Sequence, residues 1–160
     1  MSDPDDPGGR PPRVSVTDEQ ERAVDIAALE RVAESALDAA GIPGGHSLSV
    51  ALVDRARIAE LKGRYYGERR ATDVLSFSMD PLDAPAPAIL GDVVICVEVA
   101  ARQARALGRT TQSECEHLLV HGVLHLAGRD HQAPNDEIEM AREETRIVRA
   151  ARAGAAGAAS

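Results

Sequence analysis

The chain has 160 residues, enough for one domain with a substantial buried core, and its formal net charge is −8. This charge argues against a generally basic nucleic-acid-binding surface, although it is compatible with a local basic groove. Hydrophobic residues make up 44% of the chain and aromatic residues only 2%, so we expect an aliphatic core. No run approaches the roughly 20 apolar residues of a membrane span.

Neither the ends of the chain nor its cysteines suggest export. The N-terminus lacks a basic segment followed by an apolar one, so we expect no signal peptide and no membrane partner. Cys96 and Cys115 form no metal-binding pair and are typical of free thiols in a reducing cytoplasm, which is the predicted location. Residues 1–12 are rich in Asp, Pro and Gly, and residues 151–160 are mostly Ala and Gly. We therefore predict flexible tails over 1–12 and 151–160 and one folded domain over 13–150.

Between these tails, short alternating segments typical of strands are interspersed with segments of helical periodicity. In chain order, the expected elements are a strand over 13–17 that could lie at a sheet edge, a helix over 18–40, a strand over 47–53, a helix over 54–66, strands over 73–79 and 90–97, and helices over 98–107, 111–128 and 134–149. Strands and helices in separate runs predict the α+β class, with a small sheet covered by helices.

The helix over 111–128 is apolar nearly all round, and we therefore expect it to be buried against the sheet. Thr111 and Glu114 have the spacing of a capping box at its start. Gly128 can end it in the left-handed backbone conformation. Such a buried helix is a rigid platform of the kind that metal ligands need.

Four of the five histidines lie in or just before residues 119–131, LVHGVLHLAGRDH. His121 and His125 are one helical turn apart on one face, and His131 can return over that face once the helix has ended. His117 shares the face, but it lies about 12 Å from His125 along the axis. Both cannot bind one ion with bonds of roughly 2.0–2.1 Å. We therefore predict that His121, His125 and His131 bind a transition metal with an open coordination position.

The residue after the first ligand distinguishes between reaction classes. Metalloproteases with an H-E-x-x-H sequence use the glutamate there as general base, whereas this chain has Gly122. Peptide hydrolysis by that mechanism is therefore disfavoured. A hydrolase with a metal-activated water is the remaining interpretation. A second group must position or protonate the substrate, and Asp130 and nearby arginines are the candidates. His46, in a Gly-Pro loop, has no assigned role.

Residues 55–70 interleave basic and aromatic side chains. Tyr65 and Tyr66 lie in this segment among six basic residues and two glutamates. The pattern suits a surface that follows an RNA backbone and stacks bases. A solvated amphipathic helix is an equally good interpretation. The basic residues are Arg55, Arg57, Lys62, Arg64, Arg69 and Arg70.

Three blocks of the sequence form a recognisable pattern: HGVLHLAGRDH at 121–131, TDVLSF at 72–77 and the Gly91-Asp92 pair. Together they resemble the YbeY family of bacterial metal-dependent endoribonucleases, which are rRNA maturation factors. The resemblance covers 13–150 in the order of the family. It implies an α+β fold with a small mixed sheet, and one zinc ion (Zn2+) bound by His121, His125 and His131. It also implies cleavage of single-stranded RNA, chiefly at the 3′ end of small-subunit 16S rRNA, and a role in ribosome quality control. The small ribosomal subunit, and ribosomal or assembly-factor proteins, are the implied partners.

The chain departs from the family pattern at one arginine. Many members read Y-R-G before the TDVLSF block, and that arginine is considered important for cleavage, but the position holds Tyr66 here. A guanidinium that stabilises charge in the transition state must then come from elsewhere. Arg70 is our candidate, which with His121 and Asp130 makes up the predicted catalytic set. The alternatives that stay open are Arg64, Arg69 and Arg129.

Two other functions stay open. One is a metallopeptidase-like amide hydrolase on the same metal skeleton, and Gly122 counts against it. The other is a non-catalytic RNA-binding protein of ribosome assembly with a structural metal, which the missing arginine favours. Chelator-sensitive casein hydrolysis would indicate the first, and rRNA binding without cleavage would indicate the second.

Overall fold

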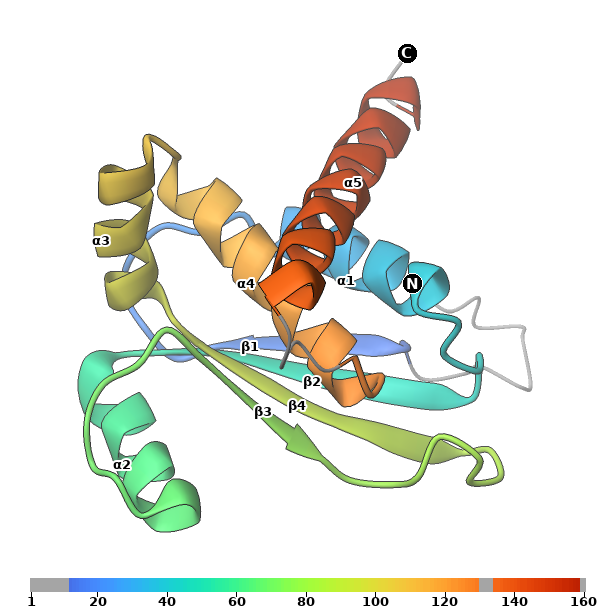
Figure 1. Ribbon diagram of the computed structural model, residues 1–160, viewed down its shortest axis with the longest axis horizontal. Coiled ribbons are helices and arrows are strands. Elements are labelled where there is room, and N and C mark those ends of the chain that lie inside the picture. Colours follow the sequence, from blue (N-terminus) through green and yellow to red (C-terminus); the bar gives the residue numbers. More distant parts are fainter. Residues whose placement is uncertain (1–11, 130–133, 159–160) are drawn as a thin grey trace, which may run out of the picture.

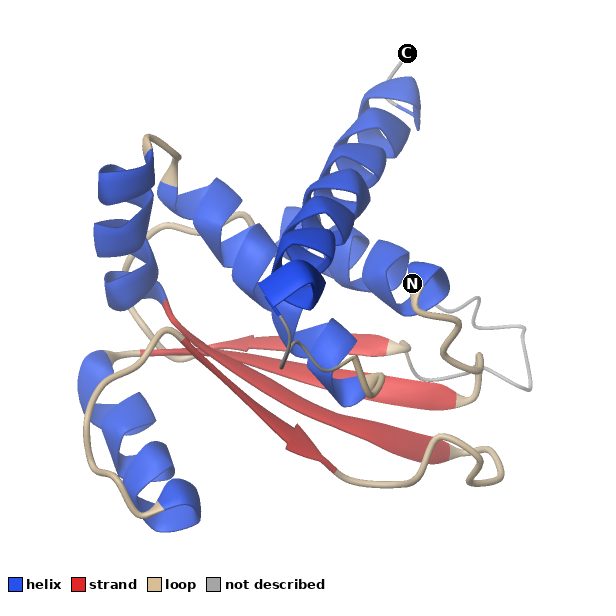
Figure 2. Ribbon diagram, viewed as in Figure 1, coloured by secondary structure: helices blue, strands red, loops and turns tan. Residues whose placement is uncertain are grey.

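The computed structural model describes the backbone of residues 12–129 and 134–158. Its strands and helices confirm the α+β class, with a small sheet covered by helices (Figures 1 and 2). The elements follow the predicted order: β1 (Val14–Asp18), α1 (Ile26–Ala39), β2 (His46–Val53), α2 (Arg55–Tyr66), β3 (Val74–Ser78), β4 (Ala88–Cys96), α3 (Val97–Leu107), α4 (Thr111–Leu126) and α5 (Pro134–Ala158).

The strands form one mixed sheet in the order β1-β2-β4-β3. β1, β2 and β4 run parallel, and β3 runs antiparallel to β4. The predicted edge position of β1 is confirmed, and β3 forms the other edge. β3 approaches β4 closely at Gly91, where an added Cβ would collide with the carbonyl oxygen of Phe77. This glycine therefore allows the two strands to pair beside the end of α4.

Helices cover the two faces of the sheet unequally. α1, α4 and α5 lie over one face with α3 beside them, whereas α2 lies alone on the other face (Figure 1). The larger core fills the first face, and a smaller core lies under α2. The prediction of a core without aromatic residues is confirmed for the described part of the chain, whose buried hydrophobic residues include none. The smaller core consists of Val53, Ile58, Leu75, Val94 and Cys96.

α4 is the central buried helix, as predicted, and it packs against α1, α3, α5, β3 and β4. The capping box predicted at its start is wrong. Thr110 is the N-cap, because its backbone is extended and its side chain accepts a hydrogen bond from Ser113 N–H at 3.0 Å. Glu114 is instead buried and paired with Arg109, with an N–O distance of 2.9 Å. Gly128 has the expected left-handed backbone, with a φ of 86°.

Two predicted boundaries are wrong. The first helix begins at Ile26 rather than near residue 18, because the Asp25 side chain caps it by accepting a hydrogen bond from Ala28 N–H at 3.0 Å. At the other end, α5 does not end near residue 149 but continues to Ala158, and so includes the described part of the segment that we expected to be flexible. Alanine has the highest helix propensity, and Ala151 is buried in the larger core, so the helix has reason to continue. Of the predicted N-terminal tail, residues 1–11 lie outside the described chain.

We expected His46 to lie in a loop, but it is the first residue of β2. Its side chain is buried, and its Nε2 lies 3.0 Å from the carbonyl oxygen of Pro81. It therefore links β2 to the loop before β4. None of the helices in the described ranges is long and apolar enough to cross a membrane.

Candidate active site

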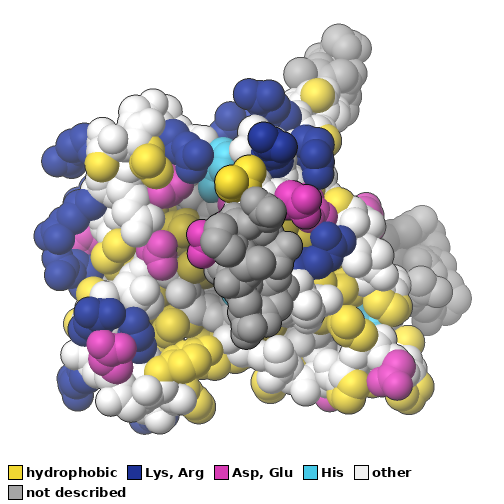
Figure 3. Space-filling view, in the orientation of Figure 1, with side chains coloured by type: hydrophobic (Ala, Val, Ile, Leu, Met, Phe, Trp, Pro, Cys, Tyr) yellow, Lys and Arg dark blue, Asp and Glu magenta, His cyan; other side chains and the backbone are white. Residues whose placement is uncertain are grey.

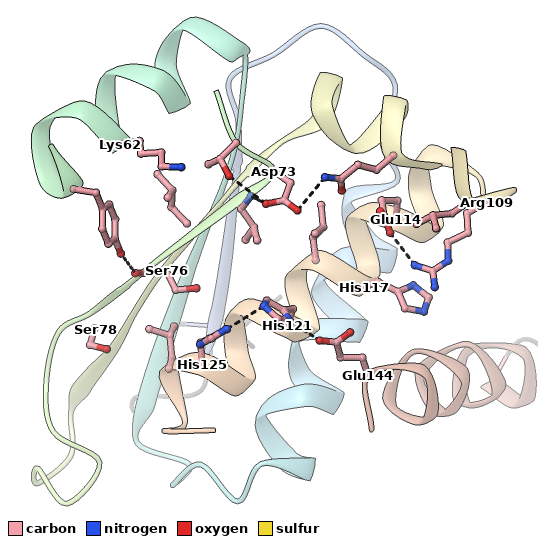
Figure 4. Close-up of a pocket in the computed structure, with 18 residues that line it drawn as sticks. Lys62, Asp73, Ser76, Ser78, Arg109, Glu114, His117, His121, His125 and Glu144 are labelled. Atoms are coloured by element: carbon pink, nitrogen blue, oxygen red, sulfur yellow. Dashed lines mark hydrogen bonds and ion pairs between the residues drawn. The ribbon is translucent and has the colours of Figure 1, made fainter. Parts of the chain in front are cut away.

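A cleft of about 700 Å³ lies along the exposed edge of β3. α2 supplies one wall, α4 supplies the opposite wall, and α3 and α5 contribute further residues (Figure 4). His117, His121 and His125 of α4 all line it. The cleft therefore brings the histidine helix and the end of the basic, aromatic segment to a common space.

His121 and His125 face each other within this cleft, as their spacing predicts. Their Nε2 atoms are 3.0 Å apart. Two nitrogens that bind a tetrahedral zinc ion with bonds of 2.0–2.1 Å lie about 3.3 Å apart. The pair is thus already close to the separation that a shared ion needs.

Glu144 of α5 orients His121. The Nδ1 atom of His121 lies 2.6 Å from Glu144 Oε1, which is short even for a hydrogen bond to an ionised carboxylate. Because a carboxylate can only accept here, Nδ1 carries the proton and the Nε2 lone pair points toward His125 Nε2, where an ion shared by the two rings would replace their direct contact. A carboxylate behind a histidine is the usual support of a metal-binding imidazole. The two described histidines and Glu144 therefore fit a zinc site.

The third predicted ligand lies outside the described residues, as does Asp130 of the predicted catalytic set. Within the described ranges, no group of three His, Cys, Asp or Glu side chains could hold a metal ion. The zinc site with His131 as third ligand stays a prediction. His117 donates its Nδ1 proton to the Ser113 carbonyl at 2.8 Å, within its own helix.

Gly122 has a packing role that the sequence did not reveal. A Cβ added to it would lie 2.8 and 3.0 Å from the two methyl groups of Val93 and 3.1 Å from Ser76 Oγ. The Ser76 hydroxyl donates a hydrogen bond of 3.3 Å to the Gly122 carbonyl, which ties β3 to α4 beside the histidines. A side chain here would require Val93 to shift, so packing disfavours the glutamate that is the general base of the H-E-x-x-H proteases.

The predicted catalytic Arg70 does not line the cleft. It lies in the loop after α2, its side chain is 69% exposed, and its Nε is 3.0 Å from Glu68. Arg129 pairs with Glu143 on α5 at 2.8 Å. The cations that line the cleft within the described chain are Lys62 and Arg109 (Figure 4). A catalytic role of Arg70 stays a prediction.

Sequence reasoning missed Glu144, although a signal was present. Met140, Ile147, Val148 and Ala151 are buried on one face of α5. Glu144 falls on that same face by helical spacing, and a carboxylate on a core-facing stripe needs a partner. The partner could not be identified from sequence, because His121 is 23 positions away.

Comparison with known proteins agrees with this fold. A family model described as endoribonuclease YbeY matches residues 15–152. Endoribonuclease YbeY of Salinispora tropica is 42% identical over 146 residues, which cover 84% of this chain and 93% of that protein. The protein of the same description from Thermobifida fusca is 44% identical over 133 residues, covering 79% and 86%. The solution structure of TM1509 from Thermotoga maritima has a TM-score of 0.62 and 25% identity, and covers 90% of this chain and 92% of that one.

The fold and the cleft define an α+β protein with a pair of facing histidines on a buried helix. The chain belongs to the endoribonuclease YbeY family, so the family resemblance of its three sequence blocks is confirmed. Members of this family are hydrolases that act on the phosphodiester bonds of RNA.

Proposed function

We propose that this protein is a zinc-dependent endoribonuclease of the cytoplasm that cleaves single-stranded RNA. Its target would be the 3′ end of 16S rRNA in the small ribosomal subunit, and it would take part in ribosome quality control. Family membership supports RNA as the substrate. The facing pair of His121 and His125, with Glu144 on the first of them, carries the proposal of metal dependence.

His121, His125 and His131 would hold the zinc ion. Bound there, zinc would supply a Lewis acid next to the scissile phosphate. Glu144 keeps His121 in the tautomer that presents Nε2 to the cleft. Because Glu144 lies on α5 and both described histidines lie on α4, packing of these two helices sets the geometry of the site.

Lys62 and Arg109 would bind the RNA backbone. Both line the cleft, and a phosphodiester that enters it is an anion. Arg109 is held by the buried carboxylate of Glu114 at 2.9 Å, which fixes the direction of its guanidinium group. Lys62 lies 3.8 Å from the exposed Glu68, a contact that RNA phosphates could replace. Arg70 would have to leave the same glutamate to reach the cleft.

Amide hydrolysis is less well supported. The position that supplies the general base in H-E-x-x-H proteases is Gly122, which packs on Val93 so closely that even an added Cβ would force a shift. A phosphodiester hydrolase does not depend on a base at that position of the helix. The same contact thus argues against the peptidase alternative on steric as well as chemical grounds.

Zinc content and RNA cleavage of purified variants test the proposal. The intact protein is expected to carry one equivalent of zinc and to cut single-stranded RNA, and His121→Ala is expected to lose both. His117→Ala is the matched control for zinc content, because His117 lies one turn earlier on α4 and bonds only to Ser113 among the described residues. Cleavage that persists in metal-free His121→Ala protein would refute metal dependence.

A further inference from the structure

All three aromatic residues of the chain lie together, and one of them, Tyr66, lines the cleft. The chain contains two tyrosines, one phenylalanine and no tryptophan. The ring centroid of Phe77 lies 5.1 Å from that of Tyr65 and 5.9 Å from that of Tyr66. The tyrosines end α2 and Phe77 lies on β3, so this aromatic cluster joins the two elements.

The two tyrosine rings are largely exposed. Tyr65 is 60% exposed and Tyr66 is 55% exposed, whereas Phe77 is half-buried and packs against the smaller core. Rings that served only to fill the core would be buried, because burial is what makes a large apolar ring stabilising. A chain whose core contains no aromatic side chain thus presents two adjacent rings to solvent. An exposed apolar patch of this kind indicates a binding surface.

Tyr66 is fixed in the wall of the cleft. Its hydroxyl donates a hydrogen bond of 3.1 Å to the Ser76 carbonyl on β3, and it lines the same cleft as His121 and His125. Ser76 in turn bonds to Gly122 on the histidine helix. Tyr66 is therefore connected to the histidine helix through β3, and its orientation is largely set before a ligand arrives.

The charges around the cluster complement a polyanion. Lys62 lies one turn before Tyr66 and lines the cleft, and Arg64, Arg69 and Arg70 are exposed near the end of α2. Basic side chains gather over this part of the molecule beside exposed hydrophobic ones (Figure 3). The protein as a whole is acidic, with a net charge of −8, whereas within residues 55–70 six basic side chains outnumber the two glutamates, Glu60 and Glu68.

We propose that Tyr65 and Tyr66, supported by Phe77, stack the unpaired bases of an RNA strand whose backbone continues into the cleft. The proposal rests on the proposed function and adds the residues that recognise the strand. Base stacking on aromatic rings requires an open base face, which a duplex interior does not offer. The aromatic cluster would thus select single-stranded RNA, while phosphate contacts bind any RNA.

Intrinsic fluorescence gives a direct test, because Tyr65 and Tyr66 are the only tyrosines and tryptophan is absent. Full-length protein is mixed with a short oligoadenylate in a stopped-flow instrument, so that binding is read before cleavage. Saturable quenching of tyrosine fluorescence is expected, with the same midpoint as the anisotropy of a labelled oligoadenylate. A duplex of oligoadenylate with oligouridylate is expected to quench little.

Alanine variants measure how much each ring contributes. Tyr65→Ala and Tyr66→Ala are each expected to raise the Kd for oligoadenylate roughly 5- to 150-fold and to change the Kd for the duplex little. Tyr66→Phe keeps the ring and is expected to retain most of the affinity. Ile138→Ala, which removes a side chain that is 53% exposed on α5, controls for loss of exposed apolar surface. Thermal melting verifies that each variant is folded.

Two results would overturn the proposal. Oligoadenylate that binds without quenching, or alanine variants that bind it as tightly as Ile138→Ala, would show that the rings do not stack on bases, while RNA binding itself would stand. If the intact protein binds neither the oligoadenylate nor the duplex, both the proposed function and this inference are refuted.

Discussion

Replacing Glu144 by glutamine should weaken zinc binding without unfolding the protein. The Glu144 carboxylate accepts a 2.6 Å hydrogen bond from His121, and its side chain is only 14% exposed, so water cannot readily take its place. Glutamine has nearly the same size, but it removes the charge and can turn its amide group toward the ring. The structure thus predicts a less basic and less well oriented His121.

The size of the effect follows from similar supports in other metal sites. Loss of the group behind a metal-binding histidine reduces metal affinity about 10- to 100-fold, equivalent to about 1.4–2.7 kcal/mol. The upper part of that range is expected here, because the bond is short and shielded from solvent. RNA cleavage at limiting zinc should fall in parallel and should recover at saturating zinc.

Glu143→Gln is the matched control. Glu143 is the preceding residue on α5 and pairs with Arg129 at 2.8 Å rather than with a histidine. Both variants remove one negative charge from the same helix, so a difference between them reports the contact with His121. Competition between the apo-protein and a chromophoric chelator measures the zinc affinity of each. Equal affinities for Glu144→Gln and Glu143→Gln would refute the assigned role of Glu144.

Three further predictions concern stability and RNA binding. Gly122→Ala should be less stable than Gly154→Ala by about 1–3 kcal/mol in urea denaturation, because a Cβ at 122 overlaps Val93 whereas one at 154 meets nothing within 4 Å. Equal stability of the two variants would contradict the packing argument. Burial raises the pKa of Cys115 from 9.0 to about 12, so the folded state favours the neutral thiol. The free energy of unfolding should therefore be unaffected by this thiol below pH ~9 and should fall by up to about 1.4 kcal/mol per pH unit above it. Cys115→Ala should lack this part of the decline, and a variant with the same pH profile as the intact protein would contradict the prediction. The association constant for single-stranded RNA, measured by fluorescence anisotropy, should depend less steeply on salt concentration in Lys62→Ala. The slope of its logarithm against the logarithm of salt concentration should decrease in magnitude by about 0.7, and an unchanged slope would show that Lys62 touches no phosphate.

Much of the architecture was predictable because it depends on residues that are close in sequence. Alternating and helical periodicity identified all the strands and helices of the described chain, and the one-turn spacing of His121 and His125 placed both on one face of a buried helix. Errors occurred at the ends of elements, where a side chain such as Asp25 or Thr110 competes with helical periodicity. The predicted third ligand, His131, lies outside the described residues.

The sequence by itself determined the fold class, the histidine helix and the absence of a general base at Gly122. Only the tertiary structure showed that Gly122 packs on Val93, that Glu144 lies beside His121, and that the three aromatic rings meet next to the cleft that Tyr66 lines. It also placed Lys62 in the cleft and Arg70 beside Glu68. The reason is physical: backbone periodicity fixes which neighbours share a face, whereas contacts between α2, β3, α4 and α5 depend on how these elements pack.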